Sequence, residues 1–333
     1  MSALPAKFIN RSPLQELYDH LSREIEQVDQ VILQSVENSV PLIANIAHHL
    51  IQAGGKRIRP LLTLASNKLF APIDQCTIYL SAAVEFIHTA TLLHDDVVDE
   101  SELRRNQPAA NTIWGNAASI LVGDFLFARA FELMVQCQNL DILRVLSSTS
   151  AKIAAGEVLQ LQYCQNFDIT QDIALEIISA KTAELFAAAC YSGSAMTGAC
   201  QESQQALHDY GYYFGLIFQI TDDILDYTSA HRGKIIGDDF REGKITLPVI
   251  FAYQNCSLEE QAFLRCLIQE NNWHENDLHK IITLIETKGG FDHCYQLAQQ
   301  FATQALKALE KVPQNLVSKL LIEMVYECLK REK

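Results

Sequence analysis

Two short acidic segments with the same spacing are the residues of this chain best suited to chemistry. Residues 95–99 read DDVVD and residues 222–226 read DDILD, and each continues an apolar, helix-like run. On an α-helix, residues four apart share a face, so Asp95 pairs with Asp99, and Asp222 with Asp226. Such like charges repel unless a cation lies over them, and Mg²⁺ prefers one or two carboxylates plus waters and substrate phosphates. Two such segments favour a diphosphate held between facing helices through bridging metals over two solvated acidic surfaces.

The sharpest basic feature is the segment GGKRIRP at residues 54–60. Its two glycines let the backbone turn and approach a ligand closely, and three cations follow within four residues. Arginine suits bidentate contacts with phosphate, whereas lysine acts as a point charge, so the segment is a candidate phosphate clamp. A basic helix N-terminus at the surface is the alternative, which the helix dipole disfavours.

The other cations are weaker signals. Arg104 and Arg105 follow the first acidic segment, and they could form a surface pair or neutralise a second phosphate. Lys181, Lys234 and Lys244 would each more often be solvated lysines.

Composition excludes several classes of function. The formal net charge of −14 argues against nonspecific nucleic-acid binding, which depends on Lys and Arg neutralising phosphates. Nine cysteines without a CxxC pair, among them Cys190, Cys200, Cys266 and Cys328 in apolar surroundings, predict reduced core thiols. We find no signal sequence and no stretch of eighteen predominantly apolar residues, so we expect no membrane span. These observations predict a soluble, cytoplasmic protein.

The spacing of proline and apolar residues predicts an all-α fold. Residues 109–247 contain no proline, and the apolar residues of 120–131 follow a helical period rather than alternation. We find no linker and no clear hairpin signal, so residues 1–333 are expected to form one domain. Helices are expected near 12–35, 38–53, 58–70, 75–100, 108–137, 141–164, 171–199 and 202–229, with more to the C-terminus. Because bundles build metal sites between facing helices, we expect one central cavity with both acidic segments at its mouth.

One further motif raises a rival function. Glu85 and His88 form an ExxH, which occurs in di-iron carboxylate bundles. That site needs two ExxH helices and two further glutamates, and the sequence has no second ExxH. There is also no GxSxG elbow and no Cys–His pairing, so the chemistry requires metals and cations rather than a protein nucleophile.

Seven stretches of the chain, taken together and in order, carry a resemblance to a known family. They are GGKRIRP, FIHTATLLHDDVVDESELRR, GNAASILVGDFLFARAF, GEVLQL, ISAKTAELF, FQITDDILDY and GDDFREGKITLP. From about residue 15 onward the chain resembles the trans-polyprenyl diphosphate synthases, and among them the long-chain, octaprenyl-type bacterial enzymes. The resemblance implies an isoprenoid-synthase helical bundle and head-to-tail condensation of isopentenyl diphosphate onto an allylic diphosphate. The implied product is a long all-trans polyprenyl diphosphate for a respiratory quinone such as ubiquinone.

The resemblance also implies roles for individual residues. Magnesium, as three ions with substrate bound, is expected at Asp95, Asp96, Asp99, Asp222, Asp223 and Asp226. Isopentenyl diphosphate is expected at Lys56, Arg59, His88 and Arg105. The allylic diphosphate is expected at Arg104, Lys181, Thr182, Gln219, Lys234 and Lys244. Of these, Lys181, Thr182 and Gln219 are expected in the catalytic centre together with Phe218, whose aromatic face could stabilise an allylic cation.

One position departs from the pattern of the family. Asn106 stands where the family usually has Gly after the paired arginines. Asn tolerates the left-handed conformation better than other non-glycine residues, so we expect the turn to survive. The placement of Arg105 depends on that turn.

Product length is expected to be set one helical turn below the first acidic segment. Ala90 and Thr91 lie five and four residues before Asp95 and face the same way. Their small side chains leave the path open for a product of roughly eight isoprene units, since one unit is about as long as one helical turn. In short-chain relatives this level generally carries aromatic bulk. Ala90 could instead be a small residue at a close helix contact.

Three alternatives to a long-chain synthase stay open: a shorter-chain (geranylgeranyl) synthase, a class I terpene cyclase, and a non-catalytic subunit of a heteromeric prenyl synthase. Cyclases commonly carry an Asn/Ser/Glu triad as the second metal motif, and partner subunits tend to lose one aspartate motif. This chain keeps both motifs. The resemblance further implies a homodimer, and the apolar product implies peripheral contact with a membrane at release.

Overall fold

A computed structural model describes residues 12–37, 40–52, 54–105, 107–228, 236–270 and 275–330. Within these ranges the regular structure is helical apart from one pair of two-residue strands, which confirms the all-α prediction. Asn106 and Lys234, both singled out from the sequence, lie outside the described residues.

The helices succeed one another along the chain with short connections. They are α1 (Pro13–His20), α2 (Ser22–Glu37), α3 (Pro41–Gln52), α4 (Ile58–Lys68), α5 (Gln75–Val98), α6 (Ala110–Trp114), α7 (Asn116–Gln136), α8 (Leu140–Gln162), α9 (Gln171–Ile178), the π-helical turn η1 (Ser179–Ala183), α10 (Glu184–Ala195), α11 (Gln201–Thr228), α12 (Asp238–Arg241), α13 (Leu247–Gln254), α14 (Leu258–Glu270), α15 (Glu275–Thr287), α16 (Gly290–Leu309) and α17 (Leu316–Lys330).

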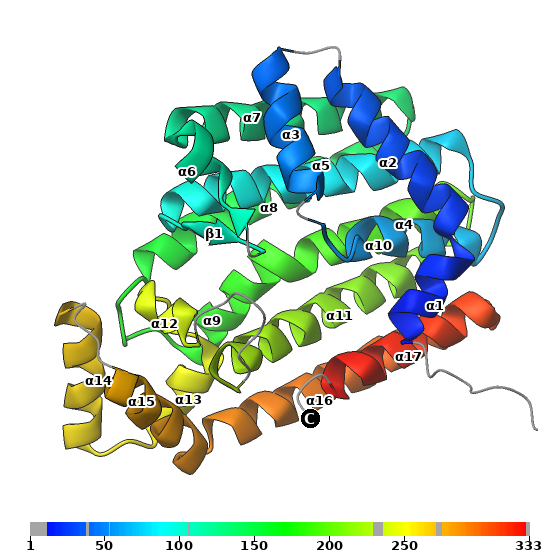
Figure 1. The fold of residues 1–333 in the computed structure, drawn as a ribbon. Helices are drawn as coiled ribbons and strands as arrows, with labels where there is room; N and C mark the ends of the chain where they lie inside the picture. Colours follow the sequence, from blue (N-terminus) through cyan, green and yellow to red (C-terminus); the bar gives the residue numbers. More distant parts are fainter. Residues whose placement is uncertain are drawn as a thin grey trace, which may run out of the picture.

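The bundle is organised around α11, which packs against α10 and α16 (Figure 1). α5 packs mainly against α7 and also contacts α4, α2 and α10. Side chains such as Leu61, Ile87, Phe186 and Tyr210 are buried where these helices meet, so the core lies between the two helices that carry the acidic segments. α14 and α15 form a corner beyond α13, and α1 lies against α17 (Figure 1).

Local sequence determines where the two helices with acidic segments begin. Asp74 caps α5, because its carboxylate accepts the Thr77 N–H at 2.8 Å. α11 begins at Gln201, one residue before the Glu202 expected from sequence. With 24 and 28 residues, the two helices are about 36 and 42 Å long. As predicted, each helix ends at its acidic segment: α5 at Val98, with Asp99 as its C-cap, and α11 at Thr228, two residues after Asp226.

Three of the expected long helices are interrupted. The helix expected at 108–137 is divided at Gly115, whose φ of 85° is outside the helical region, into α6 and α7. The helix expected at 12–35 is divided at Leu21 into α1 and α2. The helix expected at 171–199 contains η1, whose π-helical turn carries Lys181 and Thr182.

A minimal antiparallel pair was also not expected. β1 (Leu103–Arg104) pairs with β2 (Gln107–Pro108), with Leu103 opposite Pro108. Pro108 therefore belongs to a strand rather than to the start of a helix. Arg105, which follows β1, has a φ of 53° in the left-handed region. The expectation that Asn106 preserves this turn stays a prediction, because Asn106 lies outside the described residues.

Two sequence expectations about composition need correction. α5 is long and apolar enough to cross a membrane by length and composition alone, contrary to the expectation that no such stretch exists. Two-thirds of that stretch (67%) is buried inside the bundle, as in the core helix of a folded domain. All nine cysteines are free, as predicted, but Cys200 and Cys266 are exposed rather than in the core.

Candidate active site

One cavity of about 1350 Å³ opens between α4, α5, α8, η1, α11 and the segment that follows residue 236. Both acidic segments reach it, through Asp95 and Asp99 on α5 and through Asp222 and Asp223 on α11. The prediction of a cavity that both segments share is therefore confirmed. Basic residues of the loop before α4 line the same cavity, so it has an acidic and a basic side.

The first acidic segment is crowded by other negative charges. Burial raises the pKa of Asp95 to about 7, and the negative charge of Glu157 on α8 adds to the effect. Asp99, one turn on, accepts a hydrogen bond from Lys244 Nζ at 2.7 Å. The segment thus has the unfavourable like-charge arrangement that a bound cation relieves.

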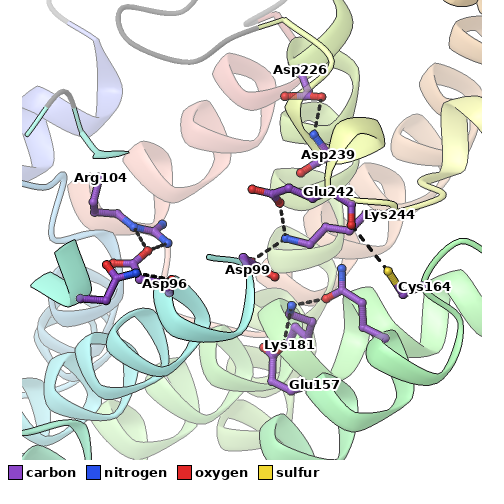
Figure 2. Close-up of polar contacts among 12 residues, drawn as sticks. Asp96, Asp99, Arg104, Glu157, Cys164, Lys181, Asp226, Asp239, Glu242 and Lys244 are labelled. Atoms are coloured by element: carbon purple, nitrogen blue, oxygen red, sulfur yellow. Dashed lines mark hydrogen bonds and ion pairs between the residues drawn. The ribbon is translucent and has the colours of Figure 1, made fainter. Parts of the chain in front are cut away.

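Asp96 points away from the cavity that its neighbours line. It is fully buried, and its Oδ1 accepts hydrogen bonds from Arg104, with the Nε donor at 2.8 Å (Figure 2). Asn111 donates from Nδ2 to the Asp96 carbonyl at 2.9 Å and to the Ser101 carbonyl at 3.1 Å. Asp96 therefore holds the loop that carries the paired arginines, and its assignment to a metal stays a prediction without geometric support.

The second acidic segment is divided differently, because its first two aspartates line the cavity and its third, Asp226, does not. Asp222 and Asp223 line the cavity, and burial followed by the charge of Asp239 raises the pKa of Asp223 well above its ordinary range. Gln219 donates from Nε2 to Asp223 at 2.8 Å. Asp226 is buried and accepts the Asp239 N–H at 3.3 Å, so it secures the following segment (Figure 2).

Lys244 connects the segment after α11 to the first acidic segment. Its Nζ lies 2.7 Å from both Asp99 Oδ2 and Glu242 Oε2 (Figure 2). Burial lowers the pKa of Lys244, but the two carboxylates outweigh burial and raise the pKa above its ordinary value. The Gln165 N–H donates to the Gly243 carbonyl at 2.8 Å, which ties this segment to the end of α8.

The residues expected in the catalytic centre also lie together. Lys181 on η1 donates from Nζ to Glu157 at 2.6 Å and contacts Gln160 (Figure 2). The Thr182 hydroxyl donates to Gln219 Oε1 at 2.8 Å. These residues and Phe218 line the cavity. Gly156 permits this approach of α8 to η1, because an added Cβ would lie 2.6 Å from the Ala180 Cβ.

Lys56, Arg59, His88 and Arg105 all line the opposite side of the cavity, and we refer to them as the basic clamp. Arg59 is half-buried, with its guanidinium 4.3 Å from the centroid of the Phe186 ring, and removal from solvent lowers its pKa to about 10. Burial lowers the pKa of His88 as well, and the surrounding arginines lower it further, so this imidazole is neutral near pH 7.

The two residues expected to set product length are placed differently. Thr91 lines the cavity, and its hydroxyl donates to the His88 carbonyl at 2.7 Å. Ala90 is fully buried and is not among the lining residues, which is the placement that the close-contact alternative predicts. Its role in product length stays a prediction.

The polar residues of the cavity that sequence reasoning missed include Glu157, Gln160, Asp239 and Glu242. All four lie within stretches that carry the family resemblance, GEVLQL and GDDFREGKITLP. Glu157 and Gln160 contact Lys181 on η1, and Asp239 contacts Asp226 on α11, so no spacing within the sequence pointed to them, whereas Glu242 pairs with Lys244 two residues on.

The donor set fits magnesium. Among the described residues there is no ready-made cluster of three or more His, Cys, Asp and Glu side chains for a metal. Each acidic segment instead offers paired carboxylates to the cavity, which is the number that Mg²⁺ takes from a protein when substrate phosphates complete its shell. Burial raises the pKa of both Asp95 and Asp223, and a cation bound at these carboxylates would offset that cost.

Comparison with known proteins agrees with this geometry. The sequence model of one family, described as polyprenyl synthetase, matches residues 40–285. This chain belongs to the polyprenyl synthetase family. It is 39% identical to the all-trans-nonaprenyl-diphosphate synthase (geranyl-diphosphate specific) of Rhodobacter capsulatus over 320 residues, covering 95% of this chain and 98% of the relative.

Two further similarities cover nearly the whole chain. The octaprenyl diphosphate synthase of Escherichia coli strain K12 is 36% identical over 322 residues, covering 96% of this chain and 99% of the relative. The crystal structure of a polyprenyl synthase from Caulobacter crescentus CB15, complexed with calcium and isoprenyl diphosphate, matches with a TM-score of 0.92 at 44% identity. That match covers 99% of this chain and 100% of the other. Members of the family are Mg²⁺-dependent trans-prenyltransferases, and this polyprenyl synthetase is a long-chain one, as its motifs predicted.

Proposed function

We propose that this polyprenyl synthetase extends an allylic diphosphate with successive isopentenyl diphosphates to a product of roughly eight isoprene units for a respiratory quinone. The observation that carries the proposal is the division of one cavity into an acidic side suited to metals and a basic side suited to a free anion. Two diphosphates can thus be bound by different chemistry within reach of each other. The names of the octaprenyl and nonaprenyl relatives support the product length.

The allylic diphosphate occupies the acidic side. Asp95 and Asp99 would hold Mg²⁺ from α5, and Asp222 and Asp223 from α11, with three ions in the loaded enzyme. When bound, these ions stabilise the negative charge that builds on the departing diphosphate. The ammonium groups of Lys181 and Lys244 lie 2.6 and 2.7 Å from carboxylates, and each would transfer from its carboxylate to that diphosphate. Arg104 and Lys234 are expected to bind the same diphosphate.

Isopentenyl diphosphate occupies the basic clamp. Arginine offers paired donors to a phosphate, and the half-buried guanidinium of Arg59 is less exposed to competing solvent than a surface arginine. The neutral His88 imidazole can donate or accept a single hydrogen bond without adding to the positive charge. Thr182 and Gln219 orient the reacting end of the allylic substrate between the two sites, and Phe218 lies against the developing cation. The departing diphosphate takes up the proton lost in each condensation.

We also propose that the enzyme is a cytoplasmic homodimer. Several large apolar side chains are exposed on α7 and α8, as expected of a surface that another copy covers. They are Ile120, Leu121 and Val135 on α7, and Val158 and Leu161 on α8. Analytical ultracentrifugation tests this proposal, since Leu121→Lys should shift a dimer towards monomer. The apolar product would leave by peripheral contact with a membrane.

One assay separates the proposed function from its alternatives. The purified chain alone is incubated with an allylic diphosphate, labelled isopentenyl diphosphate and Mg²⁺, and the products are resolved by chromatography. A long-chain synthase consumes many isopentenyl units for each primer. Products that end at four units indicate a geranylgeranyl synthase, a cyclic hydrocarbon formed without isopentenyl diphosphate indicates a cyclase, and an inactive chain indicates a non-catalytic subunit.

A further inference from the structure

Glu85 is the member of the ExxH motif that the proposed reaction leaves without a role. It lies on α5 three residues before His88, so both side chains share one face and both line the cavity. Its side chain is only 8% exposed, and a buried carboxylate is costly unless it is paired. Its partner is the guanidinium of Arg57, which donates from Nη1 to Glu85 Oε1. The carboxylate that a di-iron site would use as a metal ligand is therefore paired with an arginine.

Arg57 holds an unfavourable backbone conformation at the start of α4. Its φ of 45° and ψ of 34° lie in the left-handed region, which is costly for a residue other than glycine. Besides Glu85, the side chain contacts Asp29 on α2, with Nε 3.5 Å from Oδ1. Arg57 is the N-cap of α4, so its conformation sets the directions in which Lys56 and Arg59 leave the turn. Anchoring Arg57 therefore places two members of the basic clamp.

The same carboxylate faces two further arginines. Burial lowers the pKa of both Arg59 and Arg105, and the negative charge of Glu85 acts against that effect in each. Arg59 Nε has no hydrogen-bond partner among the described residues. The Arg105 guanidinium lies over Gly55, where an added Cβ would be 2.7 Å from its Nη1. Arg59 is half-buried and Arg105 is exposed at the cavity, and before an anion enters Glu85 is the counter-charge to both.

We propose that Glu85 is a positioning residue for the isopentenyl diphosphate site. It holds Arg57 in the left-handed turn and keeps Arg59 and Arg105 gathered, so the clamp is formed before substrate arrives. The inference rests on the proposed assignment of the basic clamp to isopentenyl diphosphate. Because a preformed site avoids the cost of ordering side chains on binding, loss of Glu85 should weaken binding of this substrate and leave the chemistry of the allylic side intact.

Steady-state kinetics of the full chain with both substrates tests the proposal. Glu85→Gln keeps an oxygen that can accept from Arg57 but removes the charge. We expect the KM for isopentenyl diphosphate to rise about ten-fold, equivalent to about 1.4 kcal/mol, which is within the range of one hydrogen bond to a charged group. The kcat and the KM for the allylic substrate should change less than about two-fold. Equal changes in all three constants would indicate a merely structural role and overturn the proposal.

Two controls separate failure of this inference from failure of the proposed function. Glu260→Gln removes a carboxylate that lies 2.7 Å from Lys288 on the surface, and it should leave all constants unchanged. Arg59→Ala tests the clamp directly. If Arg59→Ala raises the KM for isopentenyl diphosphate and Glu85→Gln does not, positioning by Glu85 is refuted while the clamp assignment stands. If Arg59→Ala has no effect on that KM, the clamp assignment fails and the inference fails with it.

A matched pair of substitutions at Arg57 tests the left-handed turn without touching Glu85. Arg57→Gly and Arg57→Ala both remove the side chain and leave Glu85 equally unpaired, but only glycine adopts a positive φ readily. We expect the glycine variant to bind isopentenyl diphosphate several-fold more tightly than the alanine variant, as measured by KM or by calorimetric titration. Equal affinity of the two variants would contradict positioning through the conformation of Arg57.

Discussion

On the acidic side of the cavity the cations of the chain lie against its carboxylates, whereas on the basic side Arg59 lies against an aromatic ring. Lys244 contacts Asp99, and Lys181 contacts Glu157. Arg59 makes no ion pair with the described residues, and its guanidinium covers the face of Phe186 instead. The acidic side must therefore exchange partners when ligands enter, because its lysines have to leave carboxylates that metals then take. Arg59 requires no such exchange and can accept an anion directly.

The largest effect on turnover should follow from substitutions that remove carboxylates of the acidic side. Asp95→Ala and Asp222→Ala each remove a carboxylate that lines the cavity, so we expect turnover to fall by orders of magnitude while circular dichroism shows unchanged helicity. Asp141→Ala is the control, since that side chain is 69% exposed and pairs only with Arg144. EDTA should abolish activity and Mg²⁺ should restore it. Full activity in excess EDTA would exclude the metal-dependent mechanism.

The next largest effects should be on the KM values of the two substrates, and they should distinguish the two sides of the cavity. Arg59→Ala should chiefly raise the KM for isopentenyl diphosphate, because it removes a charge-assisted contact worth about 1.5–3 kcal/mol, or roughly 10- to 150-fold. Lys244→Ala should instead raise the KM for the allylic substrate, because its ammonium leaves Asp99 for that diphosphate. If each substitution altered both constants equally, the assignment of the two sides would be wrong.

Product length should respond to bulk below the acidic side. Ala90→Tyr and Thr91→Tyr are expected to give active enzymes whose products stop at about three or four isoprene units, since a ring there blocks the path of the growing tail. Thr91 already lines the cavity, whereas the ring at the buried position 90 must project into it or overpack the helix contact. An unaltered long product from Ala90→Tyr, with stability lowered by about 1–3 kcal/mol, would leave Thr91 as the gate.

The smallest expected effect is on the thermal stability of the metal-free protein. The pKa of Asp95 is raised from 3.8 to about 7, so its contribution to folding is complete below about pH 4 and is lost as the pH rises to 7. Asp95→Asn should therefore raise the Tm of the metal-free protein more at pH 8 than at pH 5. Scanning calorimetry at both values measures this difference, and Mg²⁺ should reduce it. A larger gain at pH 5 would show that Asp95 is not held in the protonated form.

The broad fold was predictable because the long proline-free run and the helical period of apolar residues agree with each other. The break at Gly115 was not, since an isolated glycine within a helical pattern is usually tolerated. The strand pair at 103–108 was missed because two-residue strands are too short to show alternation. The π-helical turn likewise has no signature in apolar spacing alone.

The parts of the site that are formed by residues close together in the sequence were predictable. Asp95 and Asp99 share a helix face, and helix geometry predicts their common direction. The same geometry fails for the second segment, because Asp222 and Asp223 both line the cavity although they are rotated by about 100° from each other, and Asp226 does not line it. Glu157 is different, because its closeness to Lys181 arises only when α8 packs against η1. Such roles depend on tertiary contacts that one sequence does not specify.

The π-helical turn at Ser179–Ala183 determines the directions in which the side chains that follow it in the helix point. A wide turn of this kind amounts to one extra residue inserted into a continuous helix, and each residue advances the side chains by about 100°. Thr182 and Phe186, which both line the cavity, stand on the two sides of its end. A deletion of one residue within the turn would preserve the continuous helix, but it would rotate one of these two side chains away from the cavity. Insertions and deletions here are thus far more damaging than in the surface loops, although the helix itself would persist.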